Sequence, residues 1–383
     1  MRGNITRRGK TSWRLKFDLG RDPATGRRRI RFITVRGKRQ DAERELTRLL
    51  NAAHEAGSVE PSRLTIADYV RSWLDGADGI SPKTLERYRQ LAEQQIIPHL
   101  GAILLQKLRP AQVHDWHATL VRSGGKGGRA LSARTVGHAH RVMHRALARA
   151  AALELVSRNV VSAVKPPRVE AQEIEILAGV QMADVLAKLE GHALHPIVAV
   201  ALGTGARRGE VLALRWADVD LDGATLRIER SIEETGRGLL RFKEPKTRHG
   251  RRSISLPQSA IDALRAHRRR QLELRLALGM GRLESDSLVF ATPEGEPLSP
   301  DNLSRDWRRA VTSRGLPRVM FHALRHSHAS ALIAAGLDVL SISRRLGHGS
   351  PTVTLTVYGH LFANKDGAAA AAIEAAMRTR VEP

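Results

Sequence analysis

The sequence predicts a mainly α-helical protein with small β-sheets (α+β), arranged in three segments, 1–57, 64–168 and 175–383. Three observations support this prediction. The first segment alternates apolar and basic residues with the period of a half-buried strand. The second contains helix-starting signals without a strand pattern. The third mixes short strand-like runs with long helical stretches, and a chain of 383 residues is long enough for two or three domains.

The first segment is expected to form a small sheet with a helix, from about Arg39 to Ala56, on one face. Leu15 and Phe17 of one run, and Phe32 of the next, alternate with basic residues. Residues 1–56 contain 16 basic and 6 acidic residues, a net charge of +10. A basic sheet can enter the major groove and read base edges, although a solvated basic face on an accessory domain is the alternative. The cations expected on the open face are Arg14, Lys16, Arg29 and Arg31.

The second segment is expected to be entirely helical. Thr65 with Asp68 has the pattern of a capped helix start, and Ser81-Pro82 places a cap before a proline at the first helical position. The last long helix is expected from about Ser132 to Leu153. Its basic side chains suit phosphates, although a charged helix face is more often only solvated.

The charge of the whole chain indicates a polyanionic partner. Lys and Arg number 63 against 39 Asp and Glu, a net charge of +24, which makes nucleic acid the expected ligand. The chain has no cysteine, which excludes disulfides and thiolate metal sites. It has no apolar run of the roughly 18 residues that a membrane span needs. No apolar stretch follows the charged N-terminal residues, so a signal peptide is not expected. We therefore expect a soluble, cytoplasmic protein.

The third segment is expected to be mixed. Lys246 is expected in the turn of a hairpin formed by the second and third of its strands. Strands are expected at 225–228, 239–242 and 253–256. Helices are expected near 182–190, 194–203, 207–214, 258–278, 301–313, 322–335, 338–346 and 368–376.

Four short stretches of this segment, at 204–210, around Lys246, at 322–326 and at 346–358, have residues suited to chemistry on a phosphate. The stretch 204–210, TGARRGE, places glycine and arginine at a helix start, where free N–H groups and a guanidinium suit an anionic oxygen. A lone turn lysine such as Lys246 is usually only a surface residue. His322 and Arg325 are three residues apart, so they share a helix face. A zinc site at His322 and His326 is rejected because no thiolate or HExxH glutamate accompanies them.

In this order and at these distances, the set resembles the tyrosine recombinases, or phage integrases. The matching pieces are TGARRGE, a lysine in a turn, HALRH, LGH and a tyrosine close to the C-terminus, Tyr358. The stretches TLERYRQ and IIPHLG extend the resemblance to 64–168, which looks like the family's helical, SAM-like core-binding domain. Residues 1–57 look like its arm-binding domain, and 175–383 like its catalytic domain. Asn159-Val160 departs from the Asn-Pro of many relatives, in a linker turn without a catalytic role.

The resemblance implies a site-specific recombinase that integrates or excises a phage or other mobile element. Tyr358 would attack the phosphodiester and Lys246 would protonate the leaving 5′ oxygen. The residues implied to stabilise the transition state are Arg207, Arg325, His322 and His348, with Glu210 in support. No metal or cofactor is implied. The implied partners are double-stranded DNA attachment sites, three further copies of the chain in a tetramer, a host DNA-bending protein and an excision factor.

Three other functions remain to be compared. A type IB topoisomerase uses the same chemistry but needs no arm-like segment. A DNA-binding regulator without catalysis would have lost at least one of these residues. A metal-dependent transposase or nuclease needs clustered carboxylates, and none accompanies the basic motifs.

Overall fold

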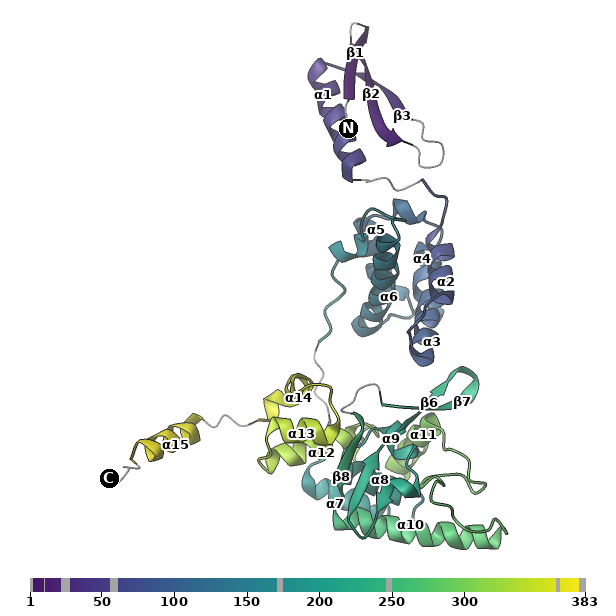
Figure 1. The fold of residues 1–383 in the computed structure, drawn as a ribbon, viewed down its shortest axis with the longest axis vertical. Helices are drawn as coiled ribbons and strands as arrows, with labels where there is room; N and C mark the ends of the chain where they lie inside the picture. Colours follow the sequence, from purple (N-terminus) through teal and green to yellow (C-terminus); the bar gives the residue numbers. More distant parts are fainter. Residues whose placement is uncertain are drawn as a thin grey trace. The chain divides into compact units, whose positions relative to one another are not determined.

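The computed structural model describes residues 3–9, 11–21, 28–55, 61–170, 175–245, 250–362 and 366–378 (Figure 1). The chain divides into two compact units, residues 1–171 and 172–383. The mostly helical fold with small sheets that the sequence predicts is confirmed.

The N-terminal residues form a three-stranded antiparallel sheet with a helix on one face (Figure 1). Leu15 and Phe17 on the sheet, and Ala42 and Leu46 on the helix, are its buried core. The alternation of apolar and basic residues around Leu15 and Phe17 therefore predicted the buried face of that strand correctly. The strand at Gly3–Gly9 was not expected. The elements are β1 (Gly3–Gly9), β2 (Ser12–Arg21), β3 (Arg28–Arg36) and α1 (Arg39–Glu55).

The expectation that the basic residues share one open face is wrong. In the register of β2 and β3, Lys16 is opposite Phe32, and buried Phe17 is opposite Arg31. Directly opposed residues lie on the same face of a sheet. Arg31 is therefore on the helix-covered face, whereas exposed Phe32 lies with Lys16 and Arg14 on the open face. The side chain of Arg29 lies outside the described residues.

Residues 61–170 form a helical unit around a core of their own. Thr65 caps the first helix by accepting a bond from the Asp68 amide, as expected. Ser132 caps the last in the same way, whereas Ser81 contacts Thr84 instead of a backbone amide. The elements are α2 (Ile66–Asp75), α3 (Pro82–Leu91), the π-helical η1 (Ala92–Ile96), α4 (Ile97–Leu100), α5 (Pro110–Ser123) and α6 (Ala133–Ala152), with short 3₁₀ turns η2 (Leu105–Lys107), η3 (Lys126–Gly128) and η4 (Val160–Ala163).

The second unit packs helices around small sheets. Its strands are β4 (Val219–Asp220), β5 (Thr225–Ile228), β6 (Ser231–Thr235), β7 (Leu239–Lys243) and β8 (Arg252–Ser255). Its helices are α7 (Gly179–Lys188), α8 (His195–Thr204), α9 (Arg208–Leu212), α10 (Gln258–Ala277), α11 (Pro300–Ser313), α12 (Ala323–Ala334), α13 (Val339–Leu346), α14 (Pro351–Tyr358) and α15 (Asp366–Arg378). Short 3₁₀ turns are η5 (Trp216–Asp218), η6 (Gly236–Gly238) and η8 (Gly359–Leu361).

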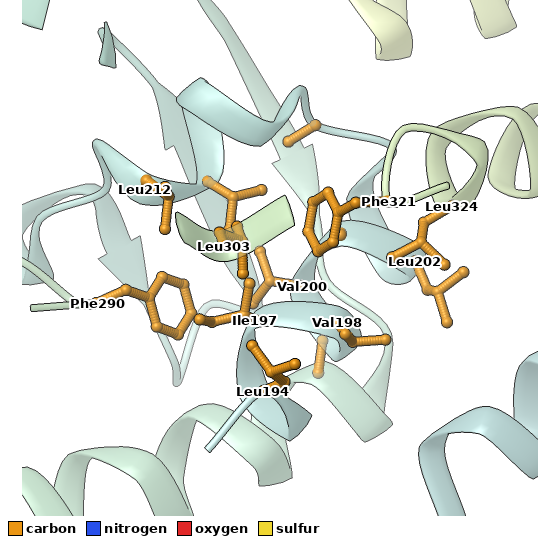
Figure 2. Close-up of a cluster of buried hydrophobic side chains, with 14 of the residues drawn as sticks. Leu194, Ile197, Val198, Val200, Leu202, Leu212, Phe290, Leu303, Phe321 and Leu324 are labelled. Carbon is orange, nitrogen blue, oxygen red and sulfur yellow. The ribbon is translucent and has the colours of Figure 1, made fainter. Parts of the chain in front are cut away.

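Helix α8 is apolar on every side and lies in the middle of this unit's core. Figure 2 shows its side chains, among them Ile197 and Val200, between Phe290 and Phe321. A helix that is hydrophobic all round is stable only when neighbours cover it on all sides. Its C-terminal end therefore has a fixed position, and the TGARRGE stretch begins there.

The hairpin expected around Lys246 is not formed by the strands that the sequence suggested. Among the described residues, β7 pairs with β6, whereas β8 pairs with β5 and belongs to a different sheet. The segment between β7 and β8 therefore connects two sheets. Strand β6 was not expected, because its SIEET sequence lacks a regular apolar alternation.

Candidate active site

Arg207 follows a tight turn that only glycine can form. Gly205 ends α8 with a φ of 64°, and a Cβ there would lie 2.6 Å from the His328 ring. Arg207 then occupies the N-cap position of α9 in an extended conformation. Its side chain is 43% exposed. The backbone of Arg207 is thus fixed by the helix start, while its guanidinium is exposed enough to contact a ligand.

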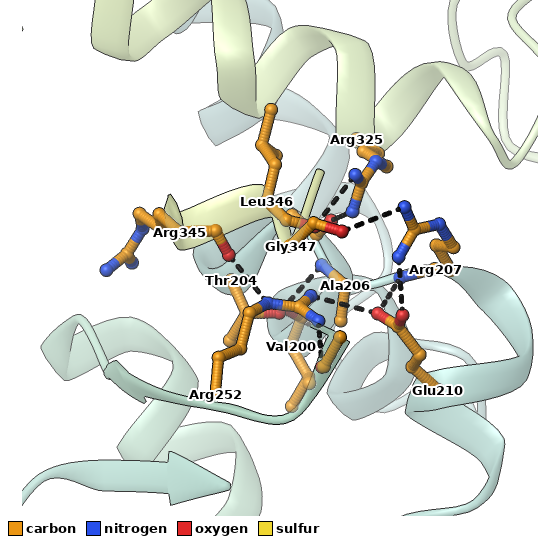
Figure 3. Close-up of polar contacts among 12 residues, drawn as sticks. Val200, Thr204, Ala206, Arg207, Glu210, Arg252, Arg325, Arg345, Leu346 and Gly347 are labelled. Carbon is orange, nitrogen blue, oxygen red and sulfur yellow. Dashed lines mark hydrogen bonds and ion pairs between the residues drawn. The ribbon is translucent and has the colours of Figure 1, made fainter. Parts of the chain in front are cut away.

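Glu210 orients Arg207 from within the protein. Its Oε1 accepts from Arg207 Nη1 at 2.7 Å, and its Oε2 accepts from the Arg207 amide at 2.9 Å (Figure 3). Burial alone would raise the pKa of Glu210, but the charges and hydrogen bonds of Arg252 and Arg207 outweigh burial and lower it. The carboxylate is therefore ionised at neutral pH and fixes the guanidinium.

Arg325 is 4% exposed and lies close to Arg207 (Figure 3). Its Nη1 donates to the carbonyl of Gly205 at 2.6 Å, and its Nη2 donates to the carbonyl of Leu346 at 2.8 Å. Burial, then repulsion by Arg207, lowers its pKa to about 9, so it stays charged at pH 7. Glu210 offsets part of the repulsion between the two cations, and a bound phosphate would offset more of it.

The LGH turn contacts both arginines. Gly347 ends α13 with a φ of 67°, and its carbonyl accepts from Arg207 Nη2 at 3.3 Å. His348, half-buried, shares a 2.8 Å hydrogen bond between its Nδ1 and the hydroxyl of Thr354. Burial and the charge of Arg325 lower its pKa to about 4. Its imidazole is therefore neutral at pH 7 and held by α14.

Tyr358 is the last residue of α14 and is only 3% exposed. Its hydroxyl lies 2.7 Å from Nδ1 of His326. His322, at the start of α12, is exposed, and its ring contacts that of His326 edge-on at 5.0 Å. His326 thus contacts the Tyr358 hydroxyl on one side and the exposed His322 ring on the other.

Lys246 lies in 246–249, outside the described residues. A pocket of 330 Å³ opens beside Arg207, Glu210 and Gly347 and is also lined by Lys243 and Pro245. A larger pocket of 610 Å³, between α8, α10 and α11, contains none of the predicted site residues. The smaller pocket is thus the one next to the predicted site.

Two contributors to the site were missed by the sequence analysis. His326 was considered only as a zinc ligand, yet it contacts the Tyr358 hydroxyl. Arg252 donates to Glu210 and to the carbonyl of Arg345. Its two-residue spacing from buried Ile254 on β8 is a signal that would have identified it as inward-facing.

In the described part of the chain, no cluster of three or more His, Asp or Glu residues could hold a metal ion. Nor is any described helix long and apolar enough to cross a membrane.

Comparisons with known proteins identify the family. Residues 175–365 match the phage integrase family, and residues 65–121 match the N-terminal SAM-like domain of phage integrases. An integrase of Streptomyces ambofaciens is 32% identical over 364 residues, which cover 90% of this chain and 88% of that protein. The chain belongs to the phage integrase family. It is a tyrosine-type site-specific recombinase that cuts and rejoins DNA for a phage or another mobile element.

Solved structures have the same fold. The Tn1549 transposon integrase in complex with transposon right end DNA aligns with a TM-score of 0.67 at 20% identity, over 82% of this chain and 99% of that one. A lambda integrase dimer bound to a core site aligns with a TM-score of 0.56 at 19% identity, over 92% and 94%. At these identities the likeness establishes the fold and leaves the roles of individual residues to be argued from this chain.

Proposed function

We propose that Tyr358 is the nucleophile of this recombinase and holds the cut strand as a 3′-phosphotyrosine. The observation that supports this most directly is the 2.7 Å contact between its hydroxyl and His326, the residue that follows Arg325 on α12. Covalent attachment conserves the phosphodiester energy, so the strand can be rejoined without ATP when a 5′ hydroxyl attacks.

Arg207 and Arg325 form the phosphate clamp. Attack on phosphorus places extra negative charge on the non-bridging oxygens, and fixed cations stabilise that charge more in the transition state than in the ground state. Glu210 and the carbonyls of Gly205 and Leu346 hold the two guanidiniums in place before DNA arrives. His322 and His348 add hydrogen bonds to the same oxygens.

Lys246 is the general acid of the cleavage step. The described residues on either side of its segment, Pro245 and Gly250, line the pocket beside Arg207. A lysine on a flexible stem suits that task, because an ammonium carries a proton that it can release to an alkoxide.

The three segments bind DNA in different ways. Residues 1–57 bind arm-type sites, residues 64–168 bind the core site, and residues 175–383 carry catalysis. Arg14 and Lys16, whose charges lie 4.7 Å and 6.0 Å from the exposed Phe32 ring, are the groups on the open sheet face best placed for the DNA. The active assembly is a tetramer on two attachment sites, assisted by a host DNA-bending protein and an excision factor.

The Tyr358→Phe variant tests the nucleophile. On a nicked suicide substrate, from which the 5′ fragment is lost after cleavage, the wild-type protein should form an adduct that survives detergent. The Phe variant should bind the same DNA and form none. An adduct in the Phe variant would assign the nucleophile to another residue.

A further inference from the structure

The hydroxyl of Tyr358 has one close polar neighbour among the described residues, Nδ1 of His326, at 2.7 Å. The two rings are tilted, with centroids 5.6 Å apart. His326 follows Arg325 on α12, and packing of α12 against α13 and α14 brings the two side chains together. The contact therefore depends on the fold of the site and is not a chance approach of two surface residues.

The surroundings of Tyr358 keep its phenol protonated. Tyr358 belongs to a buried apolar cluster with Ala329, Ile333, Ile342 and Leu346 and is almost inaccessible to water. Burial raises its pKa above the ordinary value near 10, and the charge of Arg325 offsets only part of that. A protonated phenol is a weak nucleophile, so attack on phosphorus requires an acceptor for its proton.

His326 has the state and geometry of that acceptor. Burial and the charge of Arg325 lower its pKa below the usual 6.5, so the ring is neutral at pH 7. A neutral imidazole with its proton on Nε2 accepts at Nδ1, where the hydroxyl lies. His348 does not compete, because its own Nδ1 bonds Thr354.

We propose that His326 is the general base that takes the proton of Tyr358 as this side chain attacks the DNA. The inference rests on the proposed role of Tyr358 as nucleophile. In cleavage, the phenol proton moves to Nδ1 of His326, the bond from Oη to phosphorus forms, and the bond from phosphorus to the 5′ oxygen breaks. The 5′ oxygen takes a proton from the general acid, Lys246. In rejoining, the 5′ hydroxyl attacks phosphorus and gives its proton to the now neutral Lys246. The bond from Oη to phosphorus breaks, and His326 returns its proton to the departing phenolate.

The pH dependence of cleavage distinguishes a base from a packing residue. Single-turnover adduct formation on the nicked substrate should be nearly constant for the wild type from pH 7 to 9. His326→Asn keeps an acceptor oxygen but cannot take a proton at these pH values. Its rate should fall by about 10²-fold or more at pH 7, the usual contribution of a general base. It should then recover about tenfold per pH unit as hydroxide ionises the phenol.

A second variant tests the proton transfer directly. His326→Ala should lose cleavage similarly and regain part of it when imidazole is added, because the small base can occupy the vacated space. His360→Asn is the matched control: His360 is an exposed histidine two residues after Tyr358, and its replacement should leave the rate and its pH dependence unchanged. Thermal melting and DNA binding should be measured for each variant to check that it is folded.

The outcomes separate this inference from the proposed function. Variants of His326 that cleave with the wild-type pH profile, or an equal loss in His360→Asn, would overturn the role of His326. The nucleophile would still stand if Tyr358→Phe formed no adduct. If the wild-type protein itself formed no adduct, the proposed function would fail first.

Discussion

Arg252 donates to Glu210 with a distance of 2.9 Å from Nη2 to Oε2, and their side chains are only 6% and 4% exposed. Arg252 also donates to the carbonyls of Arg345, at 2.7 Å, and Gly250, at 3.0 Å. One buried guanidinium thus connects the carboxylate that holds Arg207 with Gly250, just before β8, and with the last turn of α13. This makes Arg252 a positioning residue for the clamp.

Arg252→Met should destabilise the protein strongly, because it leaves the Glu210 carboxylate buried with only one cationic partner. The free energy of unfolding of the second unit should fall by about 3 kcal/mol, in the range typical of broken buried pairs. Denaturant titration would measure it. The matched control is Arg309→Met, whose pair with Asp306 is 74% and 51% exposed and should be worth less than about 1 kcal/mol. Equal losses in the two variants would contradict the role of Arg252.

Arg207→Ala and Arg325→Ala should each slow single-turnover cleavage by about 10²–10³, the usual loss for one donor to transition-state charge. Binding to the core site, measured by gel shift on the same fragment, should fall much less. Arg325 also holds two carbonyls in the interior, so melting must confirm that its variant is folded. A loss of binding as large as the loss of cleavage would reduce both residues to ordinary phosphate contacts.

Lys246→Ala should slow cleavage of ordinary DNA but affect DNA with a 5′-bridging sulfur much less. Sulfur leaves as a thiolate without protonation, so this substrate bypasses the general acid. The ratio of the two single-turnover rates is the measurement, with wild-type protein as the reference. Equal damage on both substrates would exclude proton donation by Lys246.

Acid should destabilise the helical unit through His140. Its ring is 7% exposed and lies 3.2 Å from that of His117, and burial, then the neighbouring His117, lowers its pKa to about 4. The unfolded chain, with an ordinary pKa near 6.5, binds the proton more readily between pH 6.5 and 4. The free energy of unfolding therefore decreases as pH falls through this window and is unaffected above it.

His140→Gln should remove part of this pH dependence. The difference in melting temperature between pH 7.5 and pH 5 should be smaller in the variant than in the wild type, because one titrating group is gone. His99→Gln is the control, since His99 is exposed in the same unit and should leave the difference unchanged. An unaltered difference in His140→Gln would assign the acid sensitivity to other groups.

The parts that could be predicted from the sequence are those set by local patterns. Alternation identified Leu15 and Phe17 as core residues, and the cap of Thr65 marked a helix start correctly. Helix α14, in contrast, was not expected. Its PTVTLTVY sequence is rich in β-branched residues that favour strands, and burial of Thr354 and Tyr358, four residues apart on one face, outweighs that preference.

The parts that could not be predicted depend on pairing between distant segments. The strands on either side of Lys246 were assigned correctly, but their partners, β5 and β6, are chosen by packing against α8 and α9. Strand register likewise decided the face of Arg31, because a shift of one residue exchanges the two faces of a strand. The contact of His326 with Tyr358 joins two helices and has no signature in either alone.

Removal of residues 1–57 should separate two DNA-binding activities. This segment has its own small core, of which Leu15 and Leu46 are members, and residues 1–56 carry a net charge of +10. The remaining chain keeps the helical unit and every catalytic candidate, so it should still bind and cleave the core site. Each phosphate contact that is lost should make the slope of log affinity against log salt shallower by about 0.9.

The truncated protein should fail to bind distal arm sites and should recombine poorly on substrates that depend on them. Linking two weak DNA-binding parts raises the effective concentration of each near its site, so the whole protein should gain affinity only on DNA that has both sites. Arg14→Ala with Lys16→Ala should reproduce much of the loss on arm DNA, whereas Arg31→Ala, on the helix-covered face, should have less effect. Footprints of all four proteins on one attachment fragment measure this. An unchanged footprint after truncation would mean that 1–57 does not read DNA, because a segment that contacts arm sites must protect them.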